Sequence, residues 1–382
     1  MFRSRGICLL FIAIVLFAVI SGCASLPIAG PLPEGVSVKK LRHFDGSSPL
    51  AWHPTGDTFA FADDLLQLYD LQTGNTVPFV PATGLAALDW SPDGRKLAAA
   101  FREGDDSLLR IFDISGNVLA ESKVRGDVTK LMWRSADEVL ASAVLTKKFS
   151  FGTNFSGVLY RWKGTAAPTA RVLNDTTIKK ATAGIPKEAL YHTFTFTVSP
   201  LGDEVVFTKL IDPPMFPAYI KIVMYNLETG AEHEAVTGEA AVSSGGAAFT
   251  ADGERIIYGN GFDSTVQLDP WTGAKKNALP SPGRTIAVSP ANLYLFLDGT
   301  LFRKDKAVAS FPAMVKGAFS PHGDHLLLSF EKNIYLISGL KEPPVATLPP
   351  AVKERLLVLR KWRSEGLISP AEYEAAKGKL QQ

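Results

Sequence analysis

The chain has 382 residues, with 40 Lys and Arg against 38 Asp and Glu, 46% hydrophobic residues, 32 Gly, 25 Pro and 2 Cys. This composition excludes a disordered chain, a collagen and a disulfide scaffold. Because the basic residues form no long run, the sequence predicts no nucleic acid partner.

The N-terminus has the layout of an export signal. Arg3 and Arg5 precede an apolar run at 7–20, which is shorter than the ~20 residues of a membrane-spanning helix. The sequence therefore predicts a signal peptide over residues 1–22. A plain signal peptide or an uncleaved anchor is the alternative to the lipoprotein signal described next.

Residues 20–23 read Ile-Ser-Gly-Cys. This run resembles the lipobox of bacterial lipoproteins, whose cysteine receives a diacylglyceryl group and often a further acyl chain such as palmitate. The resemblance implies that Cys23 is the lipidated first residue of the mature chain, with no cofactor besides its acyl groups. Because Ala24 follows the cysteine, it also implies the outer membrane, facing the periplasm. Residues 23–37 hold three prolines and are expected to form an extended tether.

One phrase recurs seven times between residues 51 and 330. Each copy has an apolar residue, a turn similar to Ser-Pro-x-Gly and a strand of small and β-branched residues. Pro fixes φ at the first corner and Gly accepts the positive φ that follows, so each copy predicts a tight hairpin. A second strand of alternating pattern follows each hairpin. The copies begin at residues 51, 89, 132, 197, 248, 287 and 318.

The copies are spaced by 31 to 65 residues, around the ~40–45 of a four-stranded propeller blade. They resemble the WD-repeat-like and Tol-associated β-propeller families over residues 38–342. The resemblance implies an all-β fold, a seven-bladed β-propeller of four-stranded antiparallel blades, with six or eight blades as alternatives. The second strands, which follow the hairpins, end in pairs such as Tyr69-Asp70 and not Trp-Asp, so we expect no strict WD-repeat network.

A propeller closes only if its last blade is joined to its first, because an open array exposes two sheet edges. Residues 38–44 stand before the first phrase and can supply the outer strand of the last blade. Residues 344–349 are the competing candidate.

A Pro-rich linker at 343–350 leads into a predicted helical hairpin at 351–382. Gly366 fits a helix stop, and the run Ser369 to Glu372 fits the start of a second helix. The segment Leu-x-x-Leu-Arg-Lys beginning at Leu356, with Gly-Leu-Ile-Ser after it, resembles the short C-terminal domain family known as SHOCT. The resemblance implies self-association into a homo-oligomer through residues 351–382. Docking on the propeller of the same chain is the alternative.

No stretch of the sequence matches a nucleophile elbow, a phosphate loop or a zinc-protease helix. His322 and His325 are the only close histidine pair, and no third ligand accompanies them, so we expect no metal site. His53 is expected to be a surface or blade-packing residue and not a metal ligand. The acidic run at 103–106 is expected to be a solvated loop instead of a cation site. The sequence therefore predicts a protein without enzymatic activity.

Three insertions lengthen the third and fourth repeats, at 147–157, 173–192 and 208–219. In a propeller these connections open on the same face, so we expect them to gather on one rim. Long loops rich in aromatic residues suit a protein contact surface; side chains folded inward are the alternative. The predicted partner-binding residues are Phe149, Phe151, Phe155, Tyr191, Met215, Phe216 and Tyr219.

Two functions from different classes follow. The first is a lipid-anchored scaffold that holds an unidentified envelope protein through the loop rim. The second is a small-ligand-binding or enzymatic propeller that uses the central channel. Small residues dominate the strands after the turns, and we expect them to line the channel, which favours the scaffold. These residues are Ala98, Ala99, Ala141, Val205 and Val206.

Overall fold

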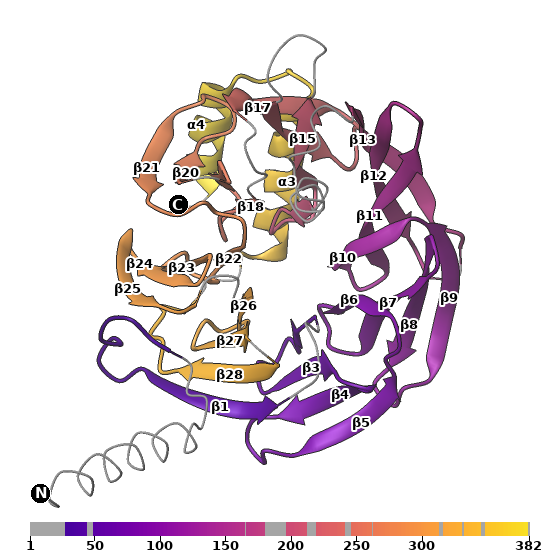
Figure 1. The fold of residues 1–382 in the computed structure, drawn as a ribbon. Coiled ribbons are helices and arrows are strands. Elements are labelled where there is room, and N and C mark those ends of the chain that lie inside the picture. Colours follow the sequence, from indigo (N-terminus) through magenta and orange to yellow (C-terminus); the bar gives the residue numbers. More distant parts are fainter. Residues whose placement is uncertain are drawn as a thin grey trace, which may run out of the picture.

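The computed structural model describes residues 27–43, 49–164, 166–179, 196–211, 219–240, 246–261, 263–312, 316–330, 332–344 and 348–380. In this part of the chain, seven four-stranded antiparallel sheets stand as blades around a central channel (Figure 1). The predicted seven-bladed β-propeller is confirmed.

The first four blades follow one another along the chain. Blade 1 contains β2 (Ala51–Trp52), β3 (Thr58–Ala62), β4 (Leu65–Asp70) and β5 (Thr76–Pro81). Blade 2 contains β6 (Leu85–Trp90), β7 (Lys96–Glu103), β8 (Asp106–Asp113) and β9 (Val118–Arg125). Blade 3 contains β10 (Asp127–Ser135), β11 (Glu138–Lys148), β12 (Gly152–Trp162) and β13 (Thr169–Lys179). Blade 4 contains β14 (Phe196–Val198), β15 (Glu204–Ile211), β16 (Tyr219–Asn226) and β17 (Glu232–Ala240).

The last three blades include one strand from the N-terminal part of the chain. Blade 5 contains β18 (Ala247–Phe249), β19 (Ile256–Gly259), β20 (Thr265–Leu268) and β21 (Lys275–Leu279). Blade 6 contains β22 (Ile286–Val288), β23 (Tyr294–Leu297), β24 (Thr300–Arg303) and β25 (Lys306–Ser310). Blade 7 contains β26 (Lys316–Phe319), β27 (His325–Phe330), β28 (Asn333–Ser338) and β1 (Ser37–His43).

The repeated phrase forms the turn between the first and second strands of each blade. In blade 2 the amide of Gly94 donates to the carbonyl of Ser91 over 2.8 Å, and Gly94 has a φ of +69°. The Ser91 hydroxyl donates to Asp93 and accepts from the amide of Lys96. In blade 6, Asn292 takes the glycine position with a φ of +58°, which Asn tolerates better than most residues.

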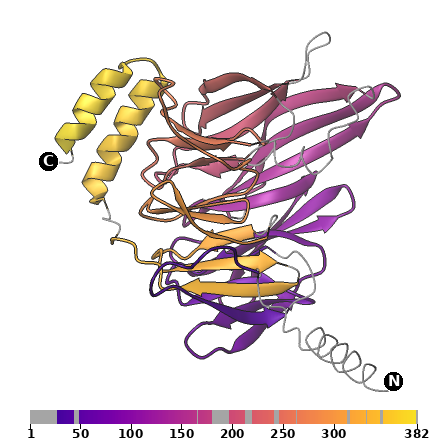
Figure 2. The ribbon, with the colours of Figure 1, turned by 60° about the vertical axis from the view of Figure 1, so that its left-hand side comes forward.

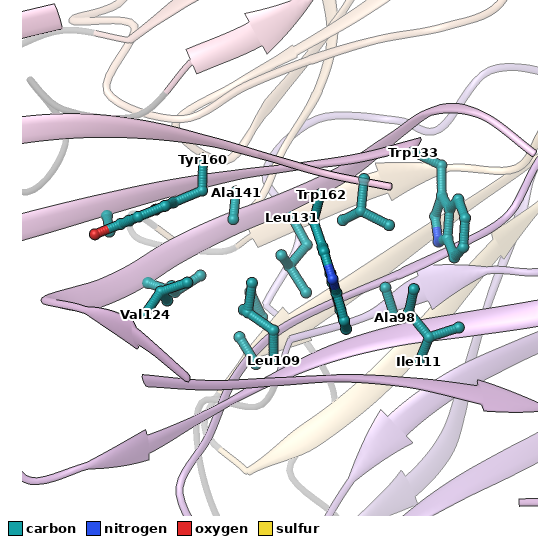
Figure 3. Close-up of a cluster of buried hydrophobic side chains, with 14 of the residues drawn as sticks. Ala98, Leu109, Ile111, Val124, Leu131, Trp133, Ala141, Tyr160 and Trp162 are labelled. Atoms are coloured by element: carbon teal, nitrogen blue, oxygen red, sulfur yellow. The ribbon is translucent and has the colours of Figure 1, made fainter. Parts of the chain in front are cut away.

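Side chains buried between neighbouring blades form the core. Between blades 2 and 3, Trp162 is 1% exposed and packs with Leu109 and Ile111 from the blade beside it (Figure 3). Ala98 belongs to the same cluster. Small residues on the second strands leave room for such large neighbours, since protein interiors are close-packed.

The ring is closed by β1, which pairs with β28 in antiparallel register, with Val38 opposite Ile337. The prediction that residues 38–44 supply the outer strand of the last blade is confirmed for 38–43, and 344–349 is wrong as the closing strand because β1 already holds that edge. Blades 1 and 7 also meet at the channel side, where Trp52 Nε1 donates to the carbonyl of Ala318 over 2.8 Å.

Two helices, α3 (Pro350–Ser364) and α4 (Pro370–Leu380), follow the propeller. Gly366 has a φ of +70°, and the amide of Leu367 donates to the carbonyl of Trp362, which is the predicted helix stop. Ser369 and Glu372 exchange side-chain and backbone hydrogen bonds as the predicted capping box. The hairpin lies against the propeller of its own chain (Figure 2).

Candidate functional site

The β11–β12 hairpin carries the first of the predicted contact residues. The insertion at 147–157 lengthens two paired strands, with Lys148 opposite Thr153. At its tip Phe149 and Phe151 are 37% and 62% exposed, and their rings stack with centroids 5.3 Å apart. The Lys147 Nζ lies 5.1 Å from the Phe149 ring centroid. The tip therefore presents a flat aromatic pair beside a cation.

Phe155 and Tyr219, the other predicted contact residues that the structure describes, do not belong to this tip. Phe155 is 6% exposed and packs with Ile222 and Met224 of blade 4, so its prediction as a surface contact is wrong. The extended β12 keeps its alternation and buries every second side chain against the neighbouring blade. Tyr219 begins β16, opposite Ile211, and is half-buried. Cys23, Tyr191, Met215 and Phe216 lie outside the described residues.

The opposite face of the propeller is the docking site of the helical hairpin. Arg360 of α3 is 1% exposed and inserts between the first turns of blades 4 and 5. Its Nη1 donates to Asp203 Oδ1 over 3.2 Å, and its Nη2 donates to Glu254 Oε1 over 3.3 Å and to the carbonyl of Gly253 over 3.1 Å. Glu204 Oε2 lies 3.9 Å from Nη1. One guanidinium thus joins the hairpin to two blades.

The charges in this cluster depend on each other. Burial and the neighbouring Asp203 raise the pKa of Glu204 to about 7, against the effect of Arg360 and Arg363. Burial opposes the charge of Arg360, but the carboxylates around it outweigh burial and raise its pKa. The guanidinium is therefore charged at every physiological pH.

Arg363 and Tyr373 complete the contact. The Arg363 guanidinium carbon lies 4.2 Å from the Trp271 ring centroid and 4.0 Å from that of Tyr373. Burial lowers the pKa of Arg363. Tyr373 is fully buried, and its hydroxyl donates to Glu254 over 3.4 Å. Lys377 forms a further ion pair with Glu254 over 2.9 Å.

The sequence analysis did not predict this acidic socket, which is formed by Asp203, Glu204 and Glu254. Four copies of the repeated phrase carry an acid directly after the turn glycine, at Asp57, Asp203, Glu254 and Asp324, so this position alone does not distinguish blades 4 and 5 from blades 1 and 7. The partner is 157 residues from Asp203 along the chain, so no local pattern links the two.

The histidines of the turn face contact neighbouring blades. His53 Nε2 lies 3.1 Å from the carbonyl of Gly94, and His322 Nε2 lies 2.9 Å from the carbonyl of Thr55. The ring of His325 stacks on Trp52 with centroids 6.2 Å apart. His53 therefore packs between blades as predicted. In the part of the chain that the structure describes, no three His, Cys, Asp or Glu side chains gather as a metal site.

The acidic run of blade 2 forms ion pairs. Lys123 Nζ lies 3.6 Å from Glu103 and 3.5 Å from Asp106. All three side chains are partly exposed to solvent, which agrees with the predicted solvated loop.

The first strands of the blades surround the central channel, so the prediction of its lining residues is wrong. Ala98, Ala99, Ala141, Val205 and Val206 lie on second strands and are buried within and between blades. Each turn connects two antiparallel strands as predicted. The strand before the turn, however, lies nearer the channel axis than the strand after it.

A cavity of about 400 Å³ occupies the channel beside blades 1, 2, 3 and 7. It contains Asp89, Lys130 and Lys316, with Thr129 and Ser329. Burial raises the pKa of Asp89 to about 7 and lowers the pKa of Lys130 to about 8. Charged residues from three blades therefore meet in this cavity.

Comparison with models of protein families and with curated proteins finds no match. In the described ranges from residue 27 to residue 380, no helix combines the length and hydropathy of a membrane span.

Proposed function

We propose that this chain is a lipid-anchored scaffold of the bacterial cell envelope that binds a partner protein through the tip of the β11–β12 hairpin. The observation that carries the proposal is the exposed stack of Phe149 and Phe151. Propellers commonly serve as platforms for protein binding, but the fold alone assigns no partner. We propose no enzymatic activity.

The tip has the properties of a binding hot spot. Aromatic residues beside a cation are enriched at protein interfaces because they bury a large area with few rotatable bonds. Ten residue pairs hold β11 against β12 up to Lys148 and Thr153, so the aromatic pair is held by a regular ladder. Such preorganisation reduces the entropy lost on binding.

The two faces of the propeller have separate roles in this proposal. The turns between first and second strands hold the helical hairpin through Arg360. The aromatic tip ends the connection between second and third strands and lies on the opposite side (Figure 2). A partner at the tip therefore leaves the docked hairpin undisturbed.

Self-association through residues 351–382 remains part of the proposal. The outer side of the hairpin carries an apolar groove of about 800 Å³ with Val358, Trp362 and Leu380 in its lining. Trp362 is 43% exposed. Docking on the propeller thus leaves one face of the hairpin open to a second copy.

The anchor is proposed from the sequence Ile-Ser-Gly-Cys at 20–23. Two or three acyl chains at Cys23 would give stable membrane attachment, since each buried CH₂ contributes about 0.8 kcal/mol. Ala24 after the cysteine supports the outer membrane, facing the periplasm.

If the aromatic tip binds the partner, removing its two aromatic side chains should reduce partner binding. Replacing Phe149 and Phe151 together by Ser should reduce recovery of the partner from solubilised membranes at least tenfold, because the variant loses its apolar contact area. Circular dichroism should remain unchanged, since both side chains are exposed. Leu119→Ser on β9, where the side chain is 49% exposed, is the matched control. Equal recovery with the tip variant and the control would contradict the proposal.

The proposed lipidation at Cys23 predicts that substitutions of the two cysteines of the chain have different effects on fatty acid labelling. Cys23→Ser should abolish labelling by a fatty acid and leave the precursor uncleaved, because only the thiol at this position accepts the diacylglyceryl group. Cys8→Ser, in the apolar run of the signal, should be labelled as the unchanged chain is. Label that persists in Cys23→Ser would exclude the lipoprotein assignment.

A further inference from the structure

The cavity in the channel has an apolar wall and an excess of positive charge. Its volume of about 400 Å³ lies within the ~300–1,000 Å³ of small-molecule sites. Leu50 and Met132 are half-buried and contribute apolar surface, and Lys130 and Lys316 contribute two ammonium groups against one carboxylate.

The carboxylate of Asp89 already has a structural partner. Its Oδ2 accepts from the amide of Trp133 over 2.8 Å, which joins blade 2 to blade 3. Among the described residues no ion pair within 4 Å links Asp89 to either lysine. Beyond this distance Asp89 still attracts Lys130 and opposes the lowering of the pKa of Lys130 by burial, whereas no described carboxylate acts in this way on Lys316.

Lys316 is exposed to the cavity and forms no hydrogen bond or ion pair with any described residue. Burial lowers its pKa, and no carboxylate opposes this effect. Lys130 Nζ donates to Thr197 Oγ1 over 3.3 Å. An ammonium group has three donors, so both lysines retain donors for a bound molecule.

We infer that this cavity binds a small organic monoanion, whose carboxylate lies between Lys130 and Lys316 and whose apolar part lies against Leu50 and Met132. Because the pKa of Asp89 is about 7, the two lysines and Asp89 together carry between one and two positive charges at pH 7, so a bound monocarboxylate leaves no net negative charge in the cavity. Inorganic phosphate has no apolar part that could contact Leu50 and Met132, so we expect it to bind less tightly than a carboxylate with an apolar part. The hydroxyls of Thr129 and Ser329 add polar groups to the wall.

This site is independent of the proposed partner contact. The cavity lies among first strands at the axis, and the aromatic tip lies at the end of the β11–β12 hairpin. Failure of one experiment therefore leaves the other proposal standing.

Calorimetric titration of the purified full chain with butyrate, benzoate and inorganic phosphate tests the site at pH 7. We expect saturable binding of at least one carboxylate, in a ratio of one to one. Lys316→Ala should weaken this binding at least tenfold, and Lys130→Gln should do the same if it folds. Lys306→Ala, on the outer strand β25 and exposed, is the matched control and should bind as the unchanged chain does.

Two results would overturn the inference. The first is the absence of saturable binding by both carboxylates, and the second is binding that Lys316→Ala leaves unchanged. Phosphate that binds more tightly than both carboxylates would overturn the assignment to a carboxylate with an apolar part.

Discussion

Replacing Arg360 by Met should release the helical hairpin from the propeller. The substitution leaves Asp203, Glu204 and Glu254 without the guanidinium that binds them. Removing one partner of a buried ion pair costs about 3–5 kcal/mol, so the docked state should become at least 100-fold less favoured. Hydrogen exchange read by mass spectrometry should show faster exchange in α3 and α4 and little change in the blades.

A control on the same helix separates charge from position. Lys361 is adjacent to Arg360, but its side chain is 56% exposed, so Lys361→Met should leave the exchange of α3 unchanged. Slow exchange of α3 in the Arg360→Met protein would show that the acidic socket does not hold the hairpin.

The same cluster should make the stability of the folded chain depend on pH. The pKa of Glu204 rises from its ordinary 4.5 to about 7, mainly through burial and then through Asp203. The folded state therefore binds this proton more tightly than the unfolded state does, and the contribution of Glu204 to the free energy of unfolding falls as pH rises from about 4.5 to about 7. Urea denaturation at pH 5 and pH 7.5 measures the free energy of unfolding at both pH values. Glu204→Gln should reduce the fall in this free energy between pH 5 and pH 7.5. The same fall in the variant and the unchanged chain would contradict the role of Glu204.

Removing residues 27–43 should destabilise the whole ring. Six residue pairs join β1 to β28, and each lost backbone hydrogen bond costs about 0.5–1.5 kcal/mol. The deletion also uncovers the edge of β28, which favours aggregation. We expect the melting temperature to fall by about 10 °C or more, since 1 kcal/mol corresponds to about 2–4 °C in a domain of comparable size.

Two comparisons support the interpretation of this deletion. Adding a peptide of residues 27–43 should restore part of the lost stability, because it can pair with β28 in the same register. Removing residues 351–382 leaves the ring closed and should lower the melting temperature less than the deletion of β1. An unchanged melting temperature without β1 would show that closure adds little stability.

Local signals predicted most of the propeller. Pro and Gly fix a turn within four residues, so the hairpin at Gly94 could be read from the sequence alone. The closing strand could be predicted because residues 38–44 were an extra strand and an open ring is unfavourable. The capping box of Ser369 and Glu372 was also visible locally.

Long-range contacts account for what was missed. Arg360 and Asp203 are 157 residues apart, and their contact depends on how the hairpin lies on blades 4 and 5. Phe155 was interpreted as a loop residue, because the sequence does not show that the insertion continues two paired strands. The channel residues Asp89, Lys130 and Lys316 come from three blades, and only the ring brings them together.

The most direct test of the proposed function places a photocrosslinking amino acid at position 151 of the chain in intact cells. We expect one discrete crosslinked species at this position, because the Phe151 side chain is 62% exposed at the hairpin tip. The same amino acid at position 119, on β9, should give no such species. A lack of crosslinks at position 151, or the same pattern at both positions, would contradict a partner contact at the aromatic tip.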